Sequence, residues 1–454
     1  MAAIAGAGVD DKAAVVRRLR ARVAPERVAE AGPVYDAAVA VWNGAARHRP
    51  AVVVRCGSTA DVVACVRTAR EHGVELSVRG GGHDWAGRGV RDDALVVDLS
   101  GLRSVVVDPV AREATVGGGT TLTGLIGAVE PLGLVAATGT VGSVGLVGLS
   151  TGGGYGPLCG RFGLAADNVV GAEVVLADGR VARVDADHEP DLFWALRGGG
   201  GNFGVVTSLR VRLHVLDQVT AGFLVFPWAQ AERVYGDVHA LLPELPRELT
   251  VQVGALATPD GTPTAVLSPT WSGDPSTGEE VIATLAALGT PLSQVRRMAY
   301  SDLLRLFSGL VVDGRRYAIG TRTLAEVTPE VVRVLLGVGD SLSSPMSGVF
   351  LHHFHGAATE VGAADTAFAP RFPHHMAELV AGWESGPDEP HLRWVAESSA
   401  ALAPHAVPGG YANLLADDAV DQVADAFAGN AARLRAVKDA YDPEGVFRAI
   451  PLPR

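Results

Sequence analysis

The sequence predicts an α+β protein with two domains and a distinct C-terminal segment. Its 454 residues exceed the length at which one hydrophobic core usually divides, so two domains are expected. Four glycine-rich clusters lie between residues 79 and 207, and strand-like and helical runs without such clusters follow after about residue 215. A long helical pattern near the C-terminus then marks a second change in the sequence pattern.

The N-terminal part begins with helical and strand patterns in alternation. Residues 11–31 read as a polar helix, and the apolar run AVVVRC reads as a strand. Ser58 or Thr59 is a suitable N-cap for a helix that ends before Gly73, and the run VELSVR follows as a second strand. Residues 50–79 therefore predict a strand–helix–strand unit.

The rest of the first domain alternates short strands with turns and short helices. Asp108-Pro109 marks a turn between strands, and GTTLTGLIGAVEPLG has a helical pattern. The run NVVGAEVVLADGRVARV predicts a hairpin with Asp178-Gly179 at its turn. A short helix is expected in EPDLFWALRG, and a long strand in NFGVVTSLRVRLHVL.

The second domain is predicted to be one sheet backed by helices. Strand-like runs alternate with helical ones; the strands are AGFLVFPW, LTVQVGALAT, TAVLSPTW and GVFLHHFHG, and the helices are AQAERVYGDVHALL, GEEVIATLAALG and TPEVVRVLLGVG. After this domain, DAVDQVADAFAGNAARLRAVKDAYDP predicts one long helix that Pro443 ends.

Charge and cysteine usage exclude several classes of partner and site. A net charge of −12 and a pI near 5.5 argue against nucleic acid and against an anionic membrane surface, because both require a basic patch. Cys56, Cys65 and Cys159 match no zinc spacing, and an odd number in a long chain favours a reducing compartment. The N-terminus lacks the features of a signal peptide, so a cytoplasmic location is expected.

The glycine clusters predict a nucleotide threaded through the backbone. They are RGGGHDW, VGGG, STGGGYGPLCGRFGLAADN and RGGGGNFGVVT, and bare glycine loops let main-chain N–H groups approach an anion closely. The run from Gly199 to Gly204 matches G-x-G-x-x-G, but a helical segment precedes it and a strand follows it. The match to a Rossmann fingerprint is therefore interpreted as spurious.

These motifs and their order resemble one family, the FAD-linked oxidases of the berberine bridge enzyme group. Length and motif detail are most similar to its bacterial nicotine oxidases. The resemblance covers nearly the whole chain and is strongest over residues 50–215. The motifs that carry it are RGGGH, GGGYGPLxxxFGLAADN, LFWALRGGGGNFGVVT and YDPEGVFR.

The resemblance implies a fold and a cofactor. The fold is α+β, with an FAD-binding domain of two subdomains (the PCMH or vanillyl-alcohol-oxidase type) over residues 1–214. A substrate domain, an antiparallel sheet backed by helices, is expected over residues 215–404. Residues 405–454 are expected to return to the FAD domain, and a monomer or homodimer is expected.

The family attaches FAD covalently to a histidine that His83 matches, and a neutral imidazole is a good nucleophile. The second linkage position of some relatives is Val141 here, so a single 8α-histidyl link is expected, and Cys159 is expected to be a buried thiol near the flavin. Val144 matches a position beside the oxygen-reacting carbon and favours an oxidase. Besides His83, the expected FAD contacts are Arg79, Gly80, Gly81, Gly82, Asp84, Val144, Gly145, Gly148, Leu149, Gly152, Gly153, Gly154, Tyr155, Gly156, Cys159, Asn168, Gly201, Asn202, Gly204, Val205, Val206 and Asn413.

The expected substrate side combines a strand and a short motif. In GVFLHHFHG, alternation places Leu351, His353 and His355 on one face, and the resemblance implies that His353 and His355 face the flavin as proton acceptors. Two such histidines without carboxylate or cysteine neighbours are too few for a metal site. In GGYANLL, Asn413 is expected at the flavin ring edge, and Tyr411 is expected to orient the substrate or act as base.

The reaction that the resemblance implies is oxidation of a small organic molecule. Hydride would pass from an organic alcohol or amine, by analogy a natural-product intermediate, to flavin N5, and O₂ would be reduced to H₂O₂. The sequence leaves four alternatives open, which are an oxygenase, an oxidative cyclase, a flavin dehydrogenase that does not react with O₂ and a flavin-binding protein that has lost catalysis.

Overall fold

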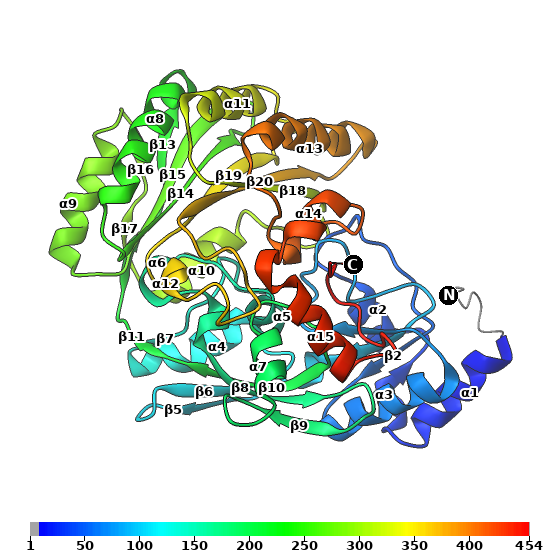
Figure 1. Ribbon diagram of the computed structural model, residues 1–454. Coiled ribbons are helices and arrows are strands. Elements are labelled where there is room, and N and C mark those ends of the chain that lie inside the picture. The colour runs from blue at the N-terminus through cyan, green and yellow to red at the C-terminus, as the bar shows by residue number, and fades with distance from the viewer. Residues whose placement is uncertain (1–8, 454) are drawn as a thin grey trace.

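The computed structural model describes residues 9–453 as two halves, one above the other in Figure 1. The blue and cyan N-terminal part forms the lower half, and the green to orange part forms the upper half with its helices outermost. The red helix α15 (Ala431–Tyr441) lies against the lower half, where it contacts α7 (Pro190–Ala195). The α+β fold class is confirmed.

The first sheet of the lower half has the strand order β1-β2-β4-β3. Strands β2, β4 and β3 are parallel, and the crossover helix is α3 (Thr59–His72). Ser58 caps this helix by accepting a hydrogen bond from Asp61 N–H, and Gly73 follows it at φ 64°. The strands are β1 (Val28–Ala29), β2 (Val52–Arg55), β3 (Leu76–Arg79) and β4 (Leu95–Asp98).

The predicted polar helix at residues 11–31 is shorter than expected. Helix α1 (Val9–Arg20) ends at Arg20, and the chain turns through the 3₁₀ helix η1 (Pro25–Arg27) into β1. Pro25 lacks the backbone N–H that a continuing helix would need, which explains the early end.

The second sheet of the lower half is antiparallel, with the order β5-β6-β10-β8-β9. The predicted hairpin at Asp178-Gly179 joins β8 to β9, and Gly179 has φ 78°. A small pair, β11 with β7, adjoins it. The strands are β5 (Val105–Asp108), β6 (Glu113–Gly117), β7 (Leu134–Val135), β8 (Val169–Val175), β9 (Val181–Val184), β10 (Val205–Arg212) and β11 (His214–Val215). The other helices of this half are α2 (Pro33–Val39), α4 (Leu122–Val129), α5 (Leu146–Thr151) and α6 (Cys159–Phe162).

The upper half is built on one antiparallel sheet, which has nine strands within the described residues. Its main order is β16-β13-β15-β14-β19-β20-β18, and β12 and β17 extend it beside β15. The strands are β12 (Val219–Ala221), β13 (Leu224–Pro227), β14 (Leu249–Ala257), β15 (Pro263–Trp271), β16 (Leu292–Ser293), β17 (Arg296–Met298), β18 (Arg316–Leu324), β19 (Gly348–Phe354) and β20 (His374–Trp383).

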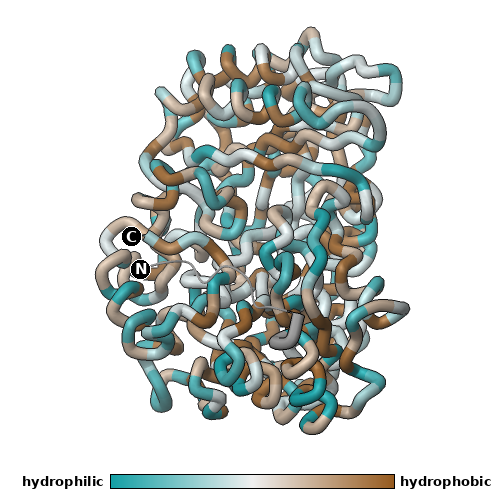
Figure 2. The backbone as a smooth tube through the Cα atoms, turned by 90° about the vertical axis from the view of Figure 1, so that its right-hand side faces the viewer, coloured by the Kyte–Doolittle hydropathy of each residue, from teal (hydrophilic) through white to brown (hydrophobic). Residues whose placement is uncertain are grey.

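Helices cover the outer face of this sheet, as the sequence predicts. They are α8 (Ala231–Leu241), α9 (Pro275–Ala286), α11 (Pro329–Asp340) and α13 (Glu389–Leu402). Two other helices of this part of the chain contact the lower half instead, α10 (Tyr300–Ser308) at α4 and α12 (Ala357–Glu360) at α6. Buried side chains of α8, α11 and α13 form one core with the outer sheet face, and two further large cores fill the lower half. Figure 2 shows hydrophobic and hydrophilic segments alternating along the chain in both halves.

The long helix predicted near the C-terminus is interrupted. Helix α14 (Val420–Asp425) ends before a turn in which Ala428 has φ 42°, and α15 begins only at Ala431. This positive φ, next to Gly429, breaks the helical path. After α15, Asp442 accepts hydrogen bonds from the N–H groups of Val446 and Phe447, and the buried Phe447 ring joins a core of the lower half.

The C-terminal segment thus packs on the half from which the chain started. The domain borders predicted after residues 214 and 404 stay predictions. The nine-stranded sheet of the upper half begins at Val219 and ends at Trp383.

Candidate functional site

A cavity of about 610 Å³ lies between the two halves. Its lower wall consists of glycine loops around residues 79–89, 139–149 and 201–206, and its upper wall is the inner face of the nine-stranded sheet. Residues 447–450 of the C-terminal segment close one side. This volume is within the range of known small-molecule and cofactor sites.

His83 lies in the wall of this cavity at the end of its glycine loop. Its Nε2 is 2.8 Å from Ser143 Oγ, and Trp42 stacks on the ring with centroids 5.4 Å apart. Gly82 has φ 73°, a conformation that side chains disfavour, so the loop depends on glycine at this point. Burial lowers the pKa of His83 to about 4, which keeps the imidazole neutral at pH 7.

Two glycine loops pack so closely that no side chain would fit between them. A Cβ on Gly81 would lie 2.3 Å from Gly145 N. By contrast, a Cβ on Gly148 would meet nothing within 4 Å, so that backbone borders open space. Arg79 also lines the cavity. Its Nη1 donates to Asp98 Oδ1 at 3.2 Å, but its Nε is a buried donor with no partner in the described part of the chain. Bare backbone and a free guanidinium N–H fit an anionic dinucleotide.

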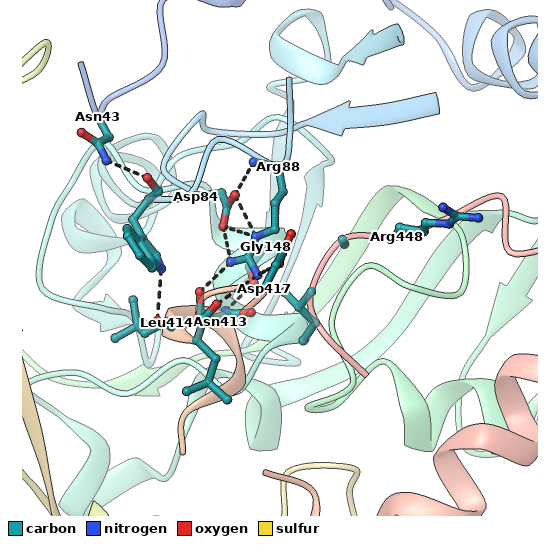
Figure 3. Close-up of polar contacts among 12 residues, drawn as sticks. Asn43, Asp84, Arg88, Gly148, Asn413, Leu414, Asp417 and Arg448 are labelled. Atoms are coloured by element: carbon teal, nitrogen blue, oxygen red, sulfur yellow. Dashed lines mark hydrogen bonds and ion pairs between the residues drawn. The ribbon is translucent and has the colours of Figure 1, made fainter. Parts of the chain in front are cut away.

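Asp84 and Arg88 attach the C-terminal segment to the His83 loop (Figure 3). Arg88 Nη2 donates to Asp84 Oδ1 at 2.6 Å and to the backbone oxygen of Asn413 at 3.1 Å. Trp85 Nε1 donates to Leu414 O at 3.1 Å. Asp84 lines the cavity, but its carboxylate holds Arg88, so its role in this structure is to position the segment around Asn413.

Tyr411, Asn413 and Tyr155 lie together at the cavity wall. Tyr411 Oη accepts a hydrogen bond from Gly154 N–H at 2.8 Å, and its ring meets Tyr155 edge-on at 5.1 Å. Asn413 Nδ2 donates to Gly148 O at 3.3 Å. Burial raises the pKa of Tyr411 to about 12, so the hydroxyl is a proton donor at neutral pH.

Most of the expected FAD contacts line the cavity, but seven do not. The structure brings these to the wall: Arg79, Gly80, Gly81, Gly82, His83, Asp84, Val144, Gly145, Gly148, Leu149, Tyr155, Gly201, Gly204, Val205, Val206 and Asn413. The exceptions are Gly152, Gly153, Gly154, Gly156, Cys159, Asn168 and Asn202.

The exceptions support the wall from behind. A Cβ on Gly152 would lie 2.0 Å from Asn413 Nδ2, so glycine lets Asn413 approach. Asn168 Nδ2 donates to Phe162 O and Leu164 O, and Asn202 Oδ1 accepts from Ala449 N–H. These polar side chains satisfy backbone groups, which explains why they are turned away from the cavity.

The expectation for Cys159 is corrected in the same way. It borders a small pocket behind Tyr155, and burial raises its pKa to about 11. A buried neutral thiol outside the main cavity does not face a bound ligand there.

The expectation that His353 and His355 face the cavity is wrong. The cavity face of the sheet carries Phe350, His352 and, on the next strand, Glu378. His352 Nε2 lies 2.7 Å from Glu378 Oε2. Alternation along β19 therefore turns the neighbouring His353 to the opposite face, where the α8–α11–α13 layer packs.

Four imidazoles gather on that outer side of the sheet. His353 stacks on His355 and His375, with centroids 4.1 and 4.8 Å apart, and His239 of α8 meets His375 at 4.8 Å. Each has one buried ring nitrogen without a hydrogen-bond partner in the described part of the chain. Between residues 9 and 453, no three His, Cys, Asp or Glu side chains are arranged to hold a metal ion.

Sequence reasoning missed His352, Glu378, Gln252, Ser143 and Trp42. A signal for one of them was present, because Glu378 is an isolated carboxylate in the strand-like run HHMAELVAGW. A charge in the middle of a buried strand requires a partner or a cavity. The others come from distant segments and carried no local signal.

Family comparisons agree with the geometry. A family described as "FAD binding domain" matches residues 50–185, and one described as "Berberine and berberine like" matches residues 410–450.

Helices between residues 9 and 453 are all too short or too polar to cross a lipid bilayer.

Similar proteins cover nearly the whole chain. The (R)-6-hydroxynicotine oxidase of Paenarthrobacter nicotinovorans is 31% identical over 91% of this chain and 93% of its own length. The FAD-linked oxidoreductase aurO of Gibberella zeae is 30% identical over 92% of this chain and 83% of its own.

Solved structures show the same fold. The 6-hydroxy-D-nicotine oxidase of Arthrobacter nicotinovorans superposes with a TM-score of 0.85 at 29% identity, covering 94% of this chain and 97% of that one. For the BBE-like 1 protein of Physcomitrella patens the TM-score is 0.87 at 22% identity, covering 97% and 99%. The expected resemblance is confirmed: this chain belongs to the FAD-linked oxidoreductases of the berberine bridge enzyme-like family.

Proposed function

We propose that this protein is an oxidase with FAD attached to His83, and that it removes hydride from a small organic alcohol or amine. The observation that carries the proposal is one continuous cavity, which runs from His83 past Asn413 and Tyr411 to the apolar inner face of the sheet. The end at His83 presents groups that fit a dinucleotide. The end at the sheet is mainly apolar with few polar groups, as is typical of a site for a small organic substrate.

The covalent link is supported by the state of His83. An imidazole attacks only through a neutral nitrogen, and burial keeps His83 in that form at pH 7. Ser143 and the stacked Trp42 hold the ring in place. Val141 lines the cavity where some relatives carry a second linkage, and valine has no nucleophilic atom, so we propose a single link.

The chain's own residues bind and orient the reactants. When bound, FAD would supply a two-electron acceptor that O₂ can reoxidise with formation of H₂O₂. Asn413 and the Gly145–Leu149 backbone would hold the edge of its ring, and the inner sheet face would exclude water from the substrate. Val144 contributes a short side chain to this part of the wall. Together with the printed name of the related (R)-6-hydroxynicotine oxidase, this supports O₂ as the final acceptor.

The linkage is tested by denaturation. After acid precipitation, the yellow colour should stay with the protein, and flavin fluorescence should stay with the denatured band. His83→Ala should lose covalent flavin while the chain remains folded by circular dichroism. The matched control is His405→Ala, since His405 is exposed and does not line the cavity. Free flavin in the supernatant of the unchanged protein would contradict the link.

The oxidase activity is tested in two half-reactions. A panel of alcohols and amines, including natural-product intermediates, is screened without air for loss of the flavin absorbance. Air is then admitted, and recovery of the absorbance is timed while H₂O₂ is assayed. Fast recovery with one H₂O₂ per product is expected. Slow recovery would indicate a dehydrogenase, and oxygen from ¹⁸O₂ in the product would indicate an oxygenase.

A further inference from the structure

We infer that His352 and Glu378 form a proton-accepting dyad on the cavity face of the sheet, and that it selects an alcohol with an apolar body as substrate. The inference rests on the proposed function, because it names the substrate class of that same site. His352 would touch the substrate hydroxyl, whereas Glu378 acts through His352 and is a positioning residue.

The register of three strands builds the dyad. On β20, Glu378 is paired with Phe350 of β19, which places it diagonally beside His352 on the same face. Gln252 of β14 is paired directly with His352 on the other side. The 2.7 Å contact between His352 Nε2 and Glu378 Oε2 therefore comes from rigid backbone, not from a mobile loop.

The contacts of the ring fix its tautomer. A carboxylate only accepts hydrogen bonds, so His352 Nε2 carries the proton and donates it to Glu378. The other nitrogen, Nδ1, is then an acceptor. Gln252 Nε2 lies 3.4 Å from Nδ1 and 3.5 Å from Nε2, so this amide is not aimed at either nitrogen. Both distances are long for an amide donor, and Nδ1 remains available to a better one. A substrate O–H is such a donor.

The proton balance of the reaction favours an alcohol over an amine. Proton transfer from the O–H to Nδ1 forms an imidazolium next to the Glu378 carboxylate, which stabilises it as in catalytic His–carboxylate pairs. The substrate C–H bond releases its hydride to the flavin, and the carbon becomes a carbonyl. A neutral amine can lose hydride to give an iminium ion without releasing an N–H proton in that step, so its oxidation does not require the dyad.

The surroundings of the dyad set the rest of the substrate. The wall around it is apolar, formed by Phe223, Val266, Phe307, Ile319, Phe350 and Val380. The titratable groups that face the His352 ring are Glu378 and Tyr155. Tyr155 lies 4.5 Å from the ring by centroid, and its Oη donates to Glu378 at 3.4 Å. Burial and Glu378 raise the pKa of Tyr155, so Tyr155 remains a donor and not a competing base.

The dyad is tested on the flavin-loaded protein with 2-naphthol, a planar aromatic alcohol with no hydrogen on its hydroxyl-bearing carbon. It cannot lose hydride there, and its anion absorbs at longer wavelength than its neutral form. At pH 7 the ionised fraction of bound 2-naphthol should exceed that of free 2-naphthol by about tenfold or more, equal to a shift of one pKa unit.

Variants assign the effect to the dyad. His352→Gln keeps a hydrogen-bonding side chain of similar reach but no basic nitrogen, so bound 2-naphthol should stay neutral. Glu378→Gln should give an intermediate fraction, because the protonated ring loses its carboxylate neighbour. His353→Phe, on the other face of the same strand, should leave the ionised fraction unchanged. Melting curves establish that each variant is folded.

The outcomes separate this inference from the proposed function. Neutral bound 2-naphthol in the unchanged protein, equal ionisation in His352→Gln, or no binding up to its solubility would overturn the dyad. Flavin bleaching by 1-aminotetralin but not by 1-tetralol would also overturn it while leaving the oxidase intact. Ionised 2-naphthol in a protein that no alcohol or amine bleaches would support the dyad and contradict the oxidase.

Discussion

The two faces of the nine-stranded sheet place the same side chain in opposite surroundings. On the cavity face, His352 contacts a carboxylate 2.7 Å away and borders open space. On the helix face, His353 stacks on His355 and His375, and His239 meets His375 edge-on. Each of these four rings has a buried nitrogen without a partner in the described part of the chain. One strand, β19, carries both kinds of histidine.

The difference shows that a histidine's partner, not its position in a motif, decides its chemistry. Burial lowers the pKa of His353 to about 2 and those of His355 and His239 to about 4, so these rings stay neutral and serve as packing groups. A carboxylate on the cavity face provides for the opposite outcome, because it can stabilise a protonated ring.

The largest effect should come from removing the cavity-face histidine. His352→Gln should lower the rate of anaerobic flavin reduction by an accepted alcohol about 10²- to 10⁴-fold, the usual contribution of a positioned base. His353→Phe should change that rate little, since His353 does not border the cavity. Rapid-mixing absorbance measurements provide the rates. Equal losses in both variants would abolish the distinction between the faces.

Acid should destabilise the protein through the helix face. The depressed pKa values mean that, between pH 6.5 and about 4, the unfolded chain binds protons that the folded chain does not. The free energy of unfolding should therefore fall with decreasing pH by about 1.4 kcal/mol per pH unit for each such histidine, and level off below the folded pKa. Urea unfolding at several pH values measures the slope. A free energy of unfolding that stays constant over this range would contradict the prediction, because the folded protein would then bind as many protons as the unfolded chain.

Local features of the fold were readable because they depend on few residues. Ser58 and Gly73 marked the ends of α3, and Asp178-Gly179 marked a hairpin, each through its own backbone preference. The break near Ala428 was missed because apolar spacing continues on both sides of it. The motifs likewise predicted most of the cavity wall, since glycine loops come from contiguous sequence.

The orientation of β19 was not readable from its own residues. Alternation separates His352 from His353, but it does not say which face meets the cavity. That is decided by the packing of α8, α11 and α13 on the other face, which involves contacts far apart in the chain. Glu378 was the available clue. A buried carboxylate requires a polar partner or a cavity, and the face of the sheet that carries His352 provides both.

A single substitution on the helix face should flatten the acid profile. His353→Phe keeps an aromatic ring against His355 and His375 but removes one titrating group and its unpartnered nitrogen. The slope of unfolding free energy below pH 6.5 should decrease by about 1.4 kcal/mol per pH unit. At pH 7 the stability should stay equal or rise, because an unsatisfied buried polar atom is gone. His405→Phe, at an exposed position, is the control and should leave the slope unchanged.

The smallest effect should come from the hydroxyl of Tyr155. At 3.4 Å its hydrogen bond to Glu378 is long, and Tyr155→Phe retains the ring that lies against His352 and Tyr411. Stability should change by about 1 kcal/mol at most, and the oxidation rate should fall far less than in His352→Gln. Melting curves and the same rapid-mixing assay measure both quantities. A loss as large as that of His352→Gln would mean that Tyr155 is a third working member of the cavity face, so that the proton acceptor is a triad and not a pair.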